Sequence, residues 1–177
     1  MTPASELGFA LRLRYRLEFI AVWCLVLIFR LLPVDTASAL GGVIARTIGP
    51  RLAVSGRAVR NIKRAMPEKT PAEIKAIVHG MWDNLGRTAA EMQHFYRLNI
   101  TEERDRFEIE YREMVKTLQD DGVGCIFFTA HLGNWEIPSL FAAQRGVPLT
   151  HIYRAANNPY VEPIIQRLRA PVSGTHH

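Results

Sequence analysis

The sequence has little cysteine, and what it has falls outside the patterns of cysteine-dependent sites. Only Cys24 and Cys125 occur among 177 residues, and neither lies at metal-ligand spacing from another cysteine or a histidine. A disulfide framework is therefore not expected to hold the fold together, and a reducing compartment is compatible with this composition. The length suffices for one domain with a substantial apolar core.

Acidic residues are scarce in the amino-terminal third. Up to Arg64 the chain has ten Lys and Arg against three Asp and Glu, a net charge of +7, whereas the remainder has a net charge of −2. This third is also strongly apolar. Its basic residues are not interleaved with stacking aromatics, and no nucleic-acid-binding motif occurs. A basic, apolar segment of this kind favours an anionic membrane surface as partner and argues against nucleic acid.

The sequence also lacks an apolar run of the roughly twenty residues that a membrane-spanning helix needs. The longest run, Phe19–Phe29, has eleven residues, and Arg12, Arg14 and Arg16 before it favour a cytoplasmic amino terminus. We therefore predict that residues 1–33 form a membrane anchor with a basic flank, as a short span or as a helix in the interface. Two alternatives remain: a signal peptide cleaved after "ASA", unusually far from the start, and a buried core helix.

Residues 35–67 combine small apolar residues with spaced arginines and are open to two interpretations. One is a helical hairpin on the surface, and the other is a basic interfacial platform that binds an anionic lipid. Gly41, Gly42 and Gly49 are expected to restrict helices here to short pieces.

A longer helix is predicted to follow. Thr70 and Glu73 have the spacing of a capping box, and apolar residues then recur at helical spacing for about six turns. A bend is expected near Gly86. His79 and His94 lie in this segment and are interpreted as structural or solvated side chains, not as catalytic groups.

The last third has the pattern of strand, helix, strand. Residues 123–130 form a continuous apolar run, residues 135–146 have helical character, and residues 147–154 form a second strand-like run. The short helical connection predicts two parallel strands with a right-handed crossover. The predicted fold class is therefore α/β: amino-terminal membrane-anchoring and interfacial helices, followed by an incomplete, mostly parallel sheet flanked by helices.

Ionisable residues follow the predicted strands, at the edge where ligands bind in open α/β sheets. His131 follows the first strand, and Arg154 ends the second. Gly133 and Asn134 turn the chain, so that Glu136 enters the next helix close to His131. A carboxylate in that position fixes the tautomer of the imidazole and leaves its other nitrogen to act as a base. A histidine satisfied by local polar groups at a strand end is the alternative, and the spacing does not distinguish the two.

These residues carry a resemblance to a known family. The segment "HLGNWE" has the pattern of the lysophospholipid acyltransferase superfamily, a His followed after four residues by Asp or Glu. Its narrower form resembles that of the lipid A biosynthesis lauroyl/myristoyl acyltransferases. The segments "RNIKRAMPEKTPAEI" and "NLGRTAAEM" upstream, and "YRAANNPYVEPIIQRLR" downstream, are similar to the same family. The resemblance covers nearly all of the chain.

The resemblance implies transfer of a fatty acyl group from an acyl carrier protein thioester to a hydroxyl of a lipid A precursor. It implies His131 as the general base and Glu136 as the group that orients it. It also implies residues that bind the substrates, namely Gly133, Asn134, Arg154 and Asn157. No metal, no cofactor beyond the thioester donor and no covalent enzyme intermediate is implied. The implied partners are acyl carrier protein, the lipid A precursor and membrane lipid, at the cytoplasmic face of the inner membrane.

The resemblance further implies a longer domain with additional strands. Residues 34–177 are therefore expected to be the amino-terminal part of the acyltransferase domain, with the carboxyl-terminal part missing. A sheet of two or three strands is a poor independent fold, so the chain is expected to be a weak or inactive enzyme. Two alternative functions remain open: an inactive membrane-anchored remnant that acts as an interaction protein, and an acyltransferase that uses a glycerophospholipid acceptor.

Overall fold

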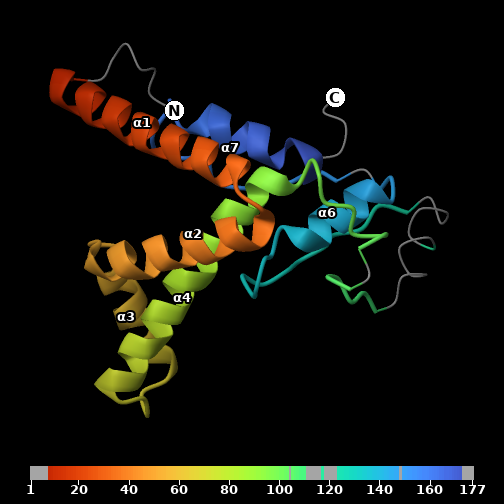
Figure 1. Cartoon of the computed structure of the whole chain (residues 1–177). Helices are drawn as coiled ribbons and strands as arrows, with labels where there is room; N and C mark the ends of the chain where they lie inside the picture. The colour runs from red at the N-terminus through yellow and green to blue at the C-terminus, as the bar shows by residue number, and fades with distance from the viewer. Residues whose placement is uncertain (1–7, 104, 111–116, 118–122, 148, 173–177) are drawn as a thin grey trace. The chain divides into compact units, whose positions relative to one another are not determined.

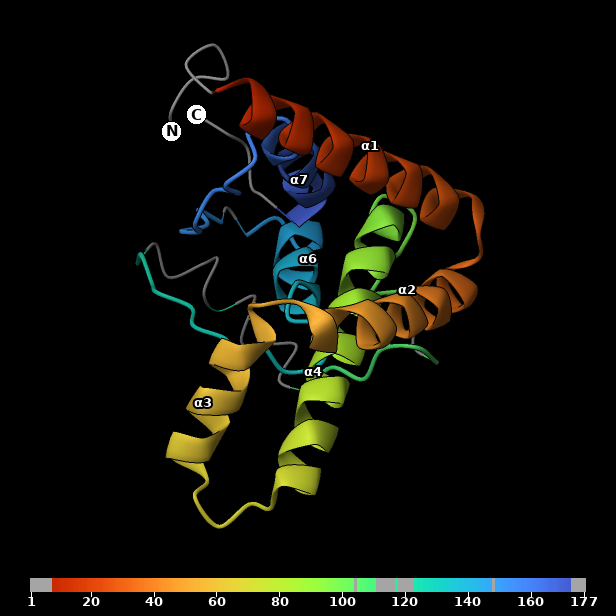
Figure 2. The ribbon, with the colours of Figure 1, turned by 90° about the vertical axis from the view of Figure 1, so that its left-hand side faces the viewer.

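The computed structural model describes residues 8–103, 105–110, 117, 123–147 and 149–172. The described elements are helices joined by turns and loops (Figure 1; Figure 2). The α-helices are α1 (Phe9–Leu31), α2 (Val34–Ile48), α3 (Ser55–Ala65), α4 (Pro71–Glu91), α6 (Ile137–Gln144) and α7 (Glu162–Arg169). The short 3₁₀ helices are η2 (Gly49–Arg51), η3 (Met92–His94) and η4 (Ala170–Val172).

The chain divides into two compact units. One consists of Met1–Ile28 together with Met92–His177, and the other is Phe29–Glu91. The two units are defined by how the chain packs. They therefore do not test the predicted division into a membrane anchor and an acyltransferase domain. An anchor at residues 1–33 and an acyltransferase domain at residues 34–177 therefore stay predictions.

The predicted parallel sheet is wrong for the described part of the chain, in which no residue lies in a strand. Residues 123–130 and 149–154 run as loops instead. Ile126 and Phe128 in the first loop are 85% and 92% exposed, and Ile152 in the second is 100% exposed. A strand forms only where a neighbouring strand pairs with its N–H and C=O groups, and the described residues supply no such neighbour. The fold over these residues is helical, not α/β.

The predicted anchor lies largely within α1. This helix runs for 23 residues without interruption, and Arg12, Arg14, Arg16 and Glu18 all lie inside it. Among the described residues, no helix is both long and apolar enough to cross a membrane. The prediction of a short membrane span is therefore not supported.

The start of α4 has the predicted capping box. The Thr70 N–H donates to a Glu73 carboxylate oxygen at 2.8 Å, and the Glu73 N–H donates to the Thr70 hydroxyl at 3.3 Å. Hydrogen bonds from the Thr70 N–H, the Lys69 ammonium and the Thr70 hydroxyl lower the pKa of Glu73 to about 2. The two groups thus satisfy N–H donors that would otherwise lack partners at the start of the helix.

In the Phe29–Glu91 unit, α2 crosses α4 in close contact (Figure 2). Gly41 of α2 and Gly86 of α4 lie at the crossing. A Cβ added to Gly41 would lie 2.8 Å from the Ala90 Cβ, and one added to Gly86 would lie 2.5 Å from the Ala45 Cβ, closer than real Cβ atoms come. α2 continues for 15 residues through Gly41, so this glycine does not end the helix. It instead allows the two backbones to touch.

A buried serine fixes the start of α3 in the same unit. The Ser55 hydroxyl donates to the Gly49 carbonyl at 2.7 Å and accepts the Trp82 indole N–H at 2.8 Å. Because both bonds are made away from water, breaking either would leave a buried polar group unsatisfied. The pair of bonds holds α3 beside α4 (Figure 1).

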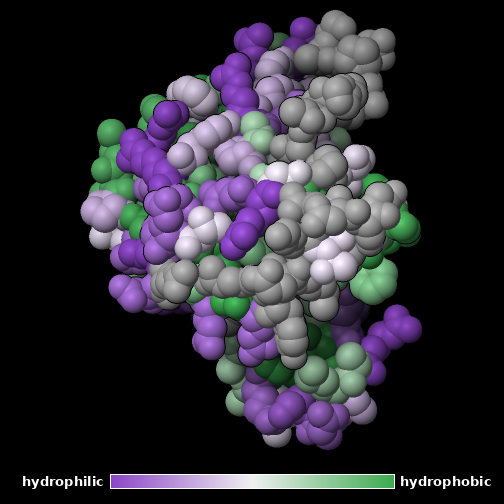
Figure 3. Space-filling model, turned by 90° about the vertical axis from the view of Figure 1, so that its right-hand side faces the viewer, coloured by the Kyte–Doolittle hydropathy of each residue, from purple (hydrophilic) through white to green (hydrophobic). Residues whose placement is uncertain are grey.

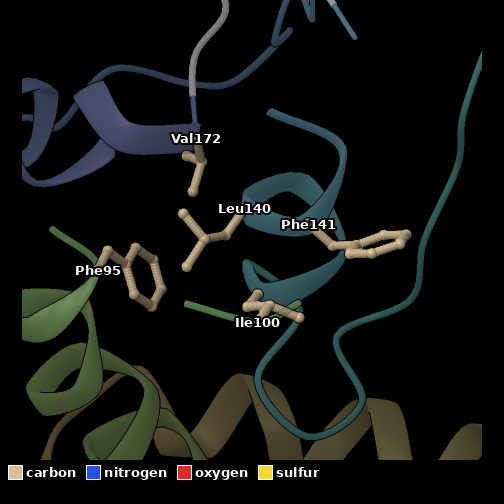
Figure 4. Packing of buried hydrophobic residues seen from close by; sticks show 5 residues of the cluster. All are labelled: Phe95, Ile100, Leu140, Phe141 and Val172. Carbon is tan, nitrogen blue, oxygen red and sulfur yellow. The ribbon is translucent and has the colours of Figure 1, made fainter. Parts of the chain in front are cut away.

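The core of the other unit gathers around α6. Its buried apolar residues are Phe95, Ile100, Leu140, Phe141 and Val172. In Figure 4, Leu140 of α6 points toward Phe95 and Val172. The Gln144 side chain, at the last residue of α6, accepts the Ile100 N–H at 3.0 Å. Full burial of side chains this large contributes about 1.5–3 kcal/mol each, so the core fixes α6 and with it the residue that precedes α6.

We predict that Gly86→Ala destabilises the crossing of α2 and α4 by about 2 kcal/mol, because the new methyl group has no room. Gly80→Ala is the matched control on the same helix. A Cβ at Gly80 meets nothing within 4 Å, so this change is expected to stabilise α4 by about 0.5–1 kcal/mol.

Urea unfolding of the two variants, with hydrogen exchange of α2 and α4 peptides, measures both effects. If Gly86→Ala were as stable as Gly80→Ala, the close approach of the two backbones would be wrong.

Candidate active site

A turn joins the loop at residues 123–131 to α6. Gly133 has a φ of +53°, a left-handed conformation that residues with a side chain adopt only at a cost. The Asn134 side-chain oxygen accepts the Glu136 N–H, and its carbonyl accepts the Ile137 N–H, both at 3.1 Å. Glu136 is therefore the residue immediately before the helix. Gly133 and Asn134 shape this turn, and their role in substrate binding stays a prediction.

His131 lies on the surface at the end of the loop. Its ring packs against Trp135, with ring centroids 4.7 Å apart and planes inclined by 54°. A general base must come within hydrogen-bond distance of the proton that it removes. An exposed imidazole meets this requirement for a substrate that arrives from solvent or from a surface.

Glu136, in contrast, is buried, with 5% of its surface exposed. Its oxygen Oε1 accepts hydrogen bonds from Arg169 Nη2 at 2.6 Å and from Arg169 Nε at 3.0 Å. A carboxylate removed from water needs a partner of opposite charge, and the guanidinium supplies it. The two hydrogen bonds fix the direction of the Glu136 side chain.

The two members of the predicted dyad therefore differ in their surroundings: His131 is exposed, and Glu136 is buried and bound by Arg169. Between His131 and Glu136, both described residues, no hydrogen bond is formed in this structure. Both Arg169 nitrogens bind the same oxygen of Glu136, and among the described residues no hydrogen bond is made to Oε2. Direct pairing of imidazole and carboxylate stays a prediction.

The structure joins two of the predicted substrate-binding residues. The Arg154 Nη2 donates to the Asn157 side-chain oxygen at 3.1 Å, and both side chains are exposed. The bond joins two residues of the loop that leads to α7. Whether Arg154 binds a substrate stays a prediction.

A second buried carboxylate, Glu162, organises the same loop. It accepts hydrogen bonds from the Ala156 N–H at 2.6 Å, the Tyr153 hydroxyl at 2.7 Å and Gln166 Nε2 at 3.1 Å. Burial acts to raise the pKa of Glu162. The three hydrogen bonds, together with the charge of Arg169, outweigh burial and hold the pKa below its ordinary value.

Arg169 connects the two carboxylates and was not among the residues predicted from the sequence. Its guanidinium carbon lies 5.1 Å from the centroid of the Tyr153 ring while its nitrogens bind Glu136. A local signal was present, because Glu162, Gln166 and Arg169 are four and then three residues apart and so lie on one face of α7. The contact with Glu136, 33 residues away, had no such signal.

Comparison with known proteins assigns the family. The sequence model of the family described as "Bacterial lipid A biosynthesis acyltransferase" matches residues 8–176. No curated protein and no solved structure gives a match. The match covers nearly the whole chain and confirms the resemblance carried by the segment around His131. The class is that of acyltransferases, and the chain belongs to the bacterial lipid A biosynthesis acyltransferase family.

We predict that Arg169→Ala destabilises the unit that contains α6 and α7 by about 3 kcal/mol, since it leaves the buried Glu136 carboxylate without a compensating charge. Arg167→Ala is the matched control. Arg167 is exposed on the same helix, and its removal should change stability by less than about 0.5 kcal/mol. Urea unfolding with hydrogen exchange of α6 peptides measures the difference, and equal stabilities would show that the ion pair contributes little.

We further predict that Glu162 makes this unit acid-sensitive. Its pKa is lower in the folded than in the unfolded chain, so its contribution to stability is complete above the ordinary value of 4.5. That contribution is lost as the pH falls through the lowered folded value. Glu162→Gln should therefore be less stable than the native chain above about pH 5, and the difference should shrink on acidification.

Unfolding free energies measured between neutral pH and about pH 3 test this dependence. The exposed Glu102→Gln serves as the control in the same unit. A pH dependence of Glu162→Gln that parallels the native chain throughout would contradict the prediction.

Proposed function

We propose that the chain transfers a fatty acyl group from an acyl carrier protein thioester to a hydroxyl group of a lipid A precursor. His131 is the general base, and Glu136 orients and stabilises it. Because the acceptor is a lipid, the reaction is placed at a membrane, on the cytoplasmic face of the inner membrane. Membership of the lipid A acyltransferase family supports the class of reaction.

The chemical steps follow from the residues. One imidazole nitrogen of His131 takes the proton of the acceptor hydroxyl as its oxygen attacks the thioester carbonyl carbon. The carbon–sulfur bond then breaks, the ester remains on the lipid, and the imidazolium returns the proton to the leaving thiolate. The other imidazole nitrogen donates to the Glu136 carboxylate, which stabilises the positive charge that develops on the ring.

The observation that carries the proposal is the contrast between the two side chains. His131 is exposed at the end of a loop, where a substrate reaches it. Glu136, five residues later, is buried at the start of a packed helix, and Arg169 holds it through Oε1 alone. This arrangement gives the buried carboxylate a partner of opposite charge, and the proposed bond from the imidazole N–H is made to Oε2.

Substrate contacts are proposed for the turn and for the loop before α7. Arg154, held by Asn157, presents a guanidinium that suits a phosphate of the acceptor or of the carrier's prosthetic group. Gly133 has no side chain at the turn after His131, and the Asn134 side chain accepts the Glu136 N–H, so a substrate would meet the backbone of this turn.

We predict that His131→Ala lowers the rate of acyl transfer by about 10²–10⁴-fold, which is the usual contribution of a positioned base. The purified chain is supplied with a labelled acyl-acyl carrier protein and either a lipid A precursor or a lysophospholipid. His79→Ala is the matched control, since His79 lies on α4 and has no role in the proposed chemistry. Both variants should keep the circular dichroism spectrum of the native chain.

Three results would contradict the proposal. The first is activity of His131→Ala within a few-fold of the native chain. The second is equal loss of activity in His79→Ala and His131→Ala. The third is transfer by the native chain to the lysophospholipid in preference to the lipid A precursor, which would reassign the acceptor.

A further inference from the structure

α3 presents a cationic surface that the proposed acyl transfer does not use. Four exposed residues, Arg57, Arg60, Lys63 and Arg64, form what we term the α3 basic face. The helix has no acidic residue, and within the described part of the chain no salt bridge engages any of the four. The four positive charges are therefore not compensated by these ion pairs, and together they attract an anionic partner to α3.

The fold determines which way these charges point. Ala58, Val59 and Ile62 are half-buried on the opposite side of α3, which packs against α4. Ser55 at the start of the helix is tied to the Gly49 carbonyl and to Trp82 of α4. At 100° per residue, the side that packs against α4 lies opposite the α3 basic face, so the four charges are directed to the outside of this unit.

Exposed apolar residues lie at both ends of the α3 basic face. Ile48, Leu52 and Val54 precede the helix and Met66 follows it, each about half exposed. In Figure 3 the lower part of the view, formed by α3 and α4, carries hydrophilic and hydrophobic surfaces side by side. Exposed cationic and apolar side chains that are neighbours along the chain suit the headgroup region of a bilayer, where anionic headgroups and acyl chains stabilise both.

The same residues fit other anionic partners less well. Residues 48–81 contain no Phe, Trp or Tyr, so α3 offers no large aromatic platform for the bases of a single-stranded nucleic acid. An acidic, well-solvated protein would be attracted by the charges, but it would not bury the exposed apolar groups.

We propose that the α3 basic face docks on the anionic headgroups of a phospholipid bilayer. The docked surface belongs to the Phe29–Glu91 unit. Docking goes beyond the proposed acyl transfer and does not depend on it.

The test measures binding of the full chain to vesicles of phosphatidylcholine with about one-third phosphatidylglycerol, compared with phosphatidylcholine alone. Arg57, Arg60 and Arg64 occupy one row of the helix and are replaced together, as R57Q/R60Q/R64Q. Each cationic residue near an anionic surface contributes about fivefold to the partition coefficient, so the triple variant should bind the anionic vesicles on the order of 100-fold more weakly at low salt. Binding to the neutral vesicles should not change.

The matched control removes the same charge from the other unit, as R97Q/R106Q/R167Q. These residues are exposed and lie outside α3, so the control variant should bind the anionic vesicles within a few-fold of the native chain. The difference between the two triple variants should disappear at about 1 M salt, where the Debye length is about 3 Å. Equal weakening by both variants would show a general charge effect and would overturn the proposal.

Two further measurements separate this proposal from its rivals. Unchanged vesicle binding by R57Q/R60Q/R64Q, with weaker binding to purified acyl carrier protein, would assign the surface to an acidic protein and overturn bilayer docking. Acyl transfer measured in detergent micelles should be the same for the native chain and R57Q/R60Q/R64Q. Failure of His131→Ala to reduce transfer would affect only the proposed function, and failure of α3 to direct vesicle binding would affect only this proposal.

Discussion

The ion pair between Arg169 and Glu136 is the contact on which the described site depends. It joins the last residue of α7 to the residue before α6, and it places a buried carboxylate beside the turn that carries His131. An uncompensated carboxylate at that position would cost several kcal/mol, so the guanidinium stabilises the contact between the end of α7 and the start of α6. The same guanidinium lies over Tyr153, whose hydroxyl donates to Glu162. One arginine therefore links the start of α6 with the loop that contains Arg154.

The sequence predicted those features whose signal is local. The capping box at Thr70 and Glu73 placed the start of α4 correctly, because both partners lie within one helical turn. The helix after the "HLGNWE" turn was also correct, since α6 lies inside the predicted segment. Gly41 and Gly86 were interpreted only through the cost of glycine to a helix. At the crossing of α2 and α4 that cost is offset by the close approach that Gly41 and Gly86 allow.

Features that depend on distant partners could not be predicted in this way. The apolar run at residues 123–130 resembles a buried strand, but a strand also needs a neighbouring strand, and composition does not reveal whether one is present. Over the described residues the segment is an exposed loop. Similarly, the sequence predicted His131 as the partner of Glu136. In the structure Glu136 is bound by Arg169 of α7, and pairing with His131 stays a prediction. The spacing of Glu162, Gln166 and Arg169 puts them on one face of α7, but spacing alone does not identify Glu136 as a partner of Arg169.

The two members of the proposed dyad differ in how firmly the chain holds them, and this difference has consequences for catalysis. Glu136 is fixed by burial, by its place before a packed helix and by two hydrogen bonds from one guanidinium. His131 is exposed and has the ring of Trp135 as its neighbour. Catalysis requires the reacting groups to be held in place, and misplacement by about 1 Å can cost about a hundredfold in rate. The carboxylate is thus organised before substrate arrives. The proposed dyad requires the imidazole N–H to turn toward the Glu136 carboxylate, so on this proposal the ordering of the loop at His131, not of the helix at Glu136, limits formation of the dyad.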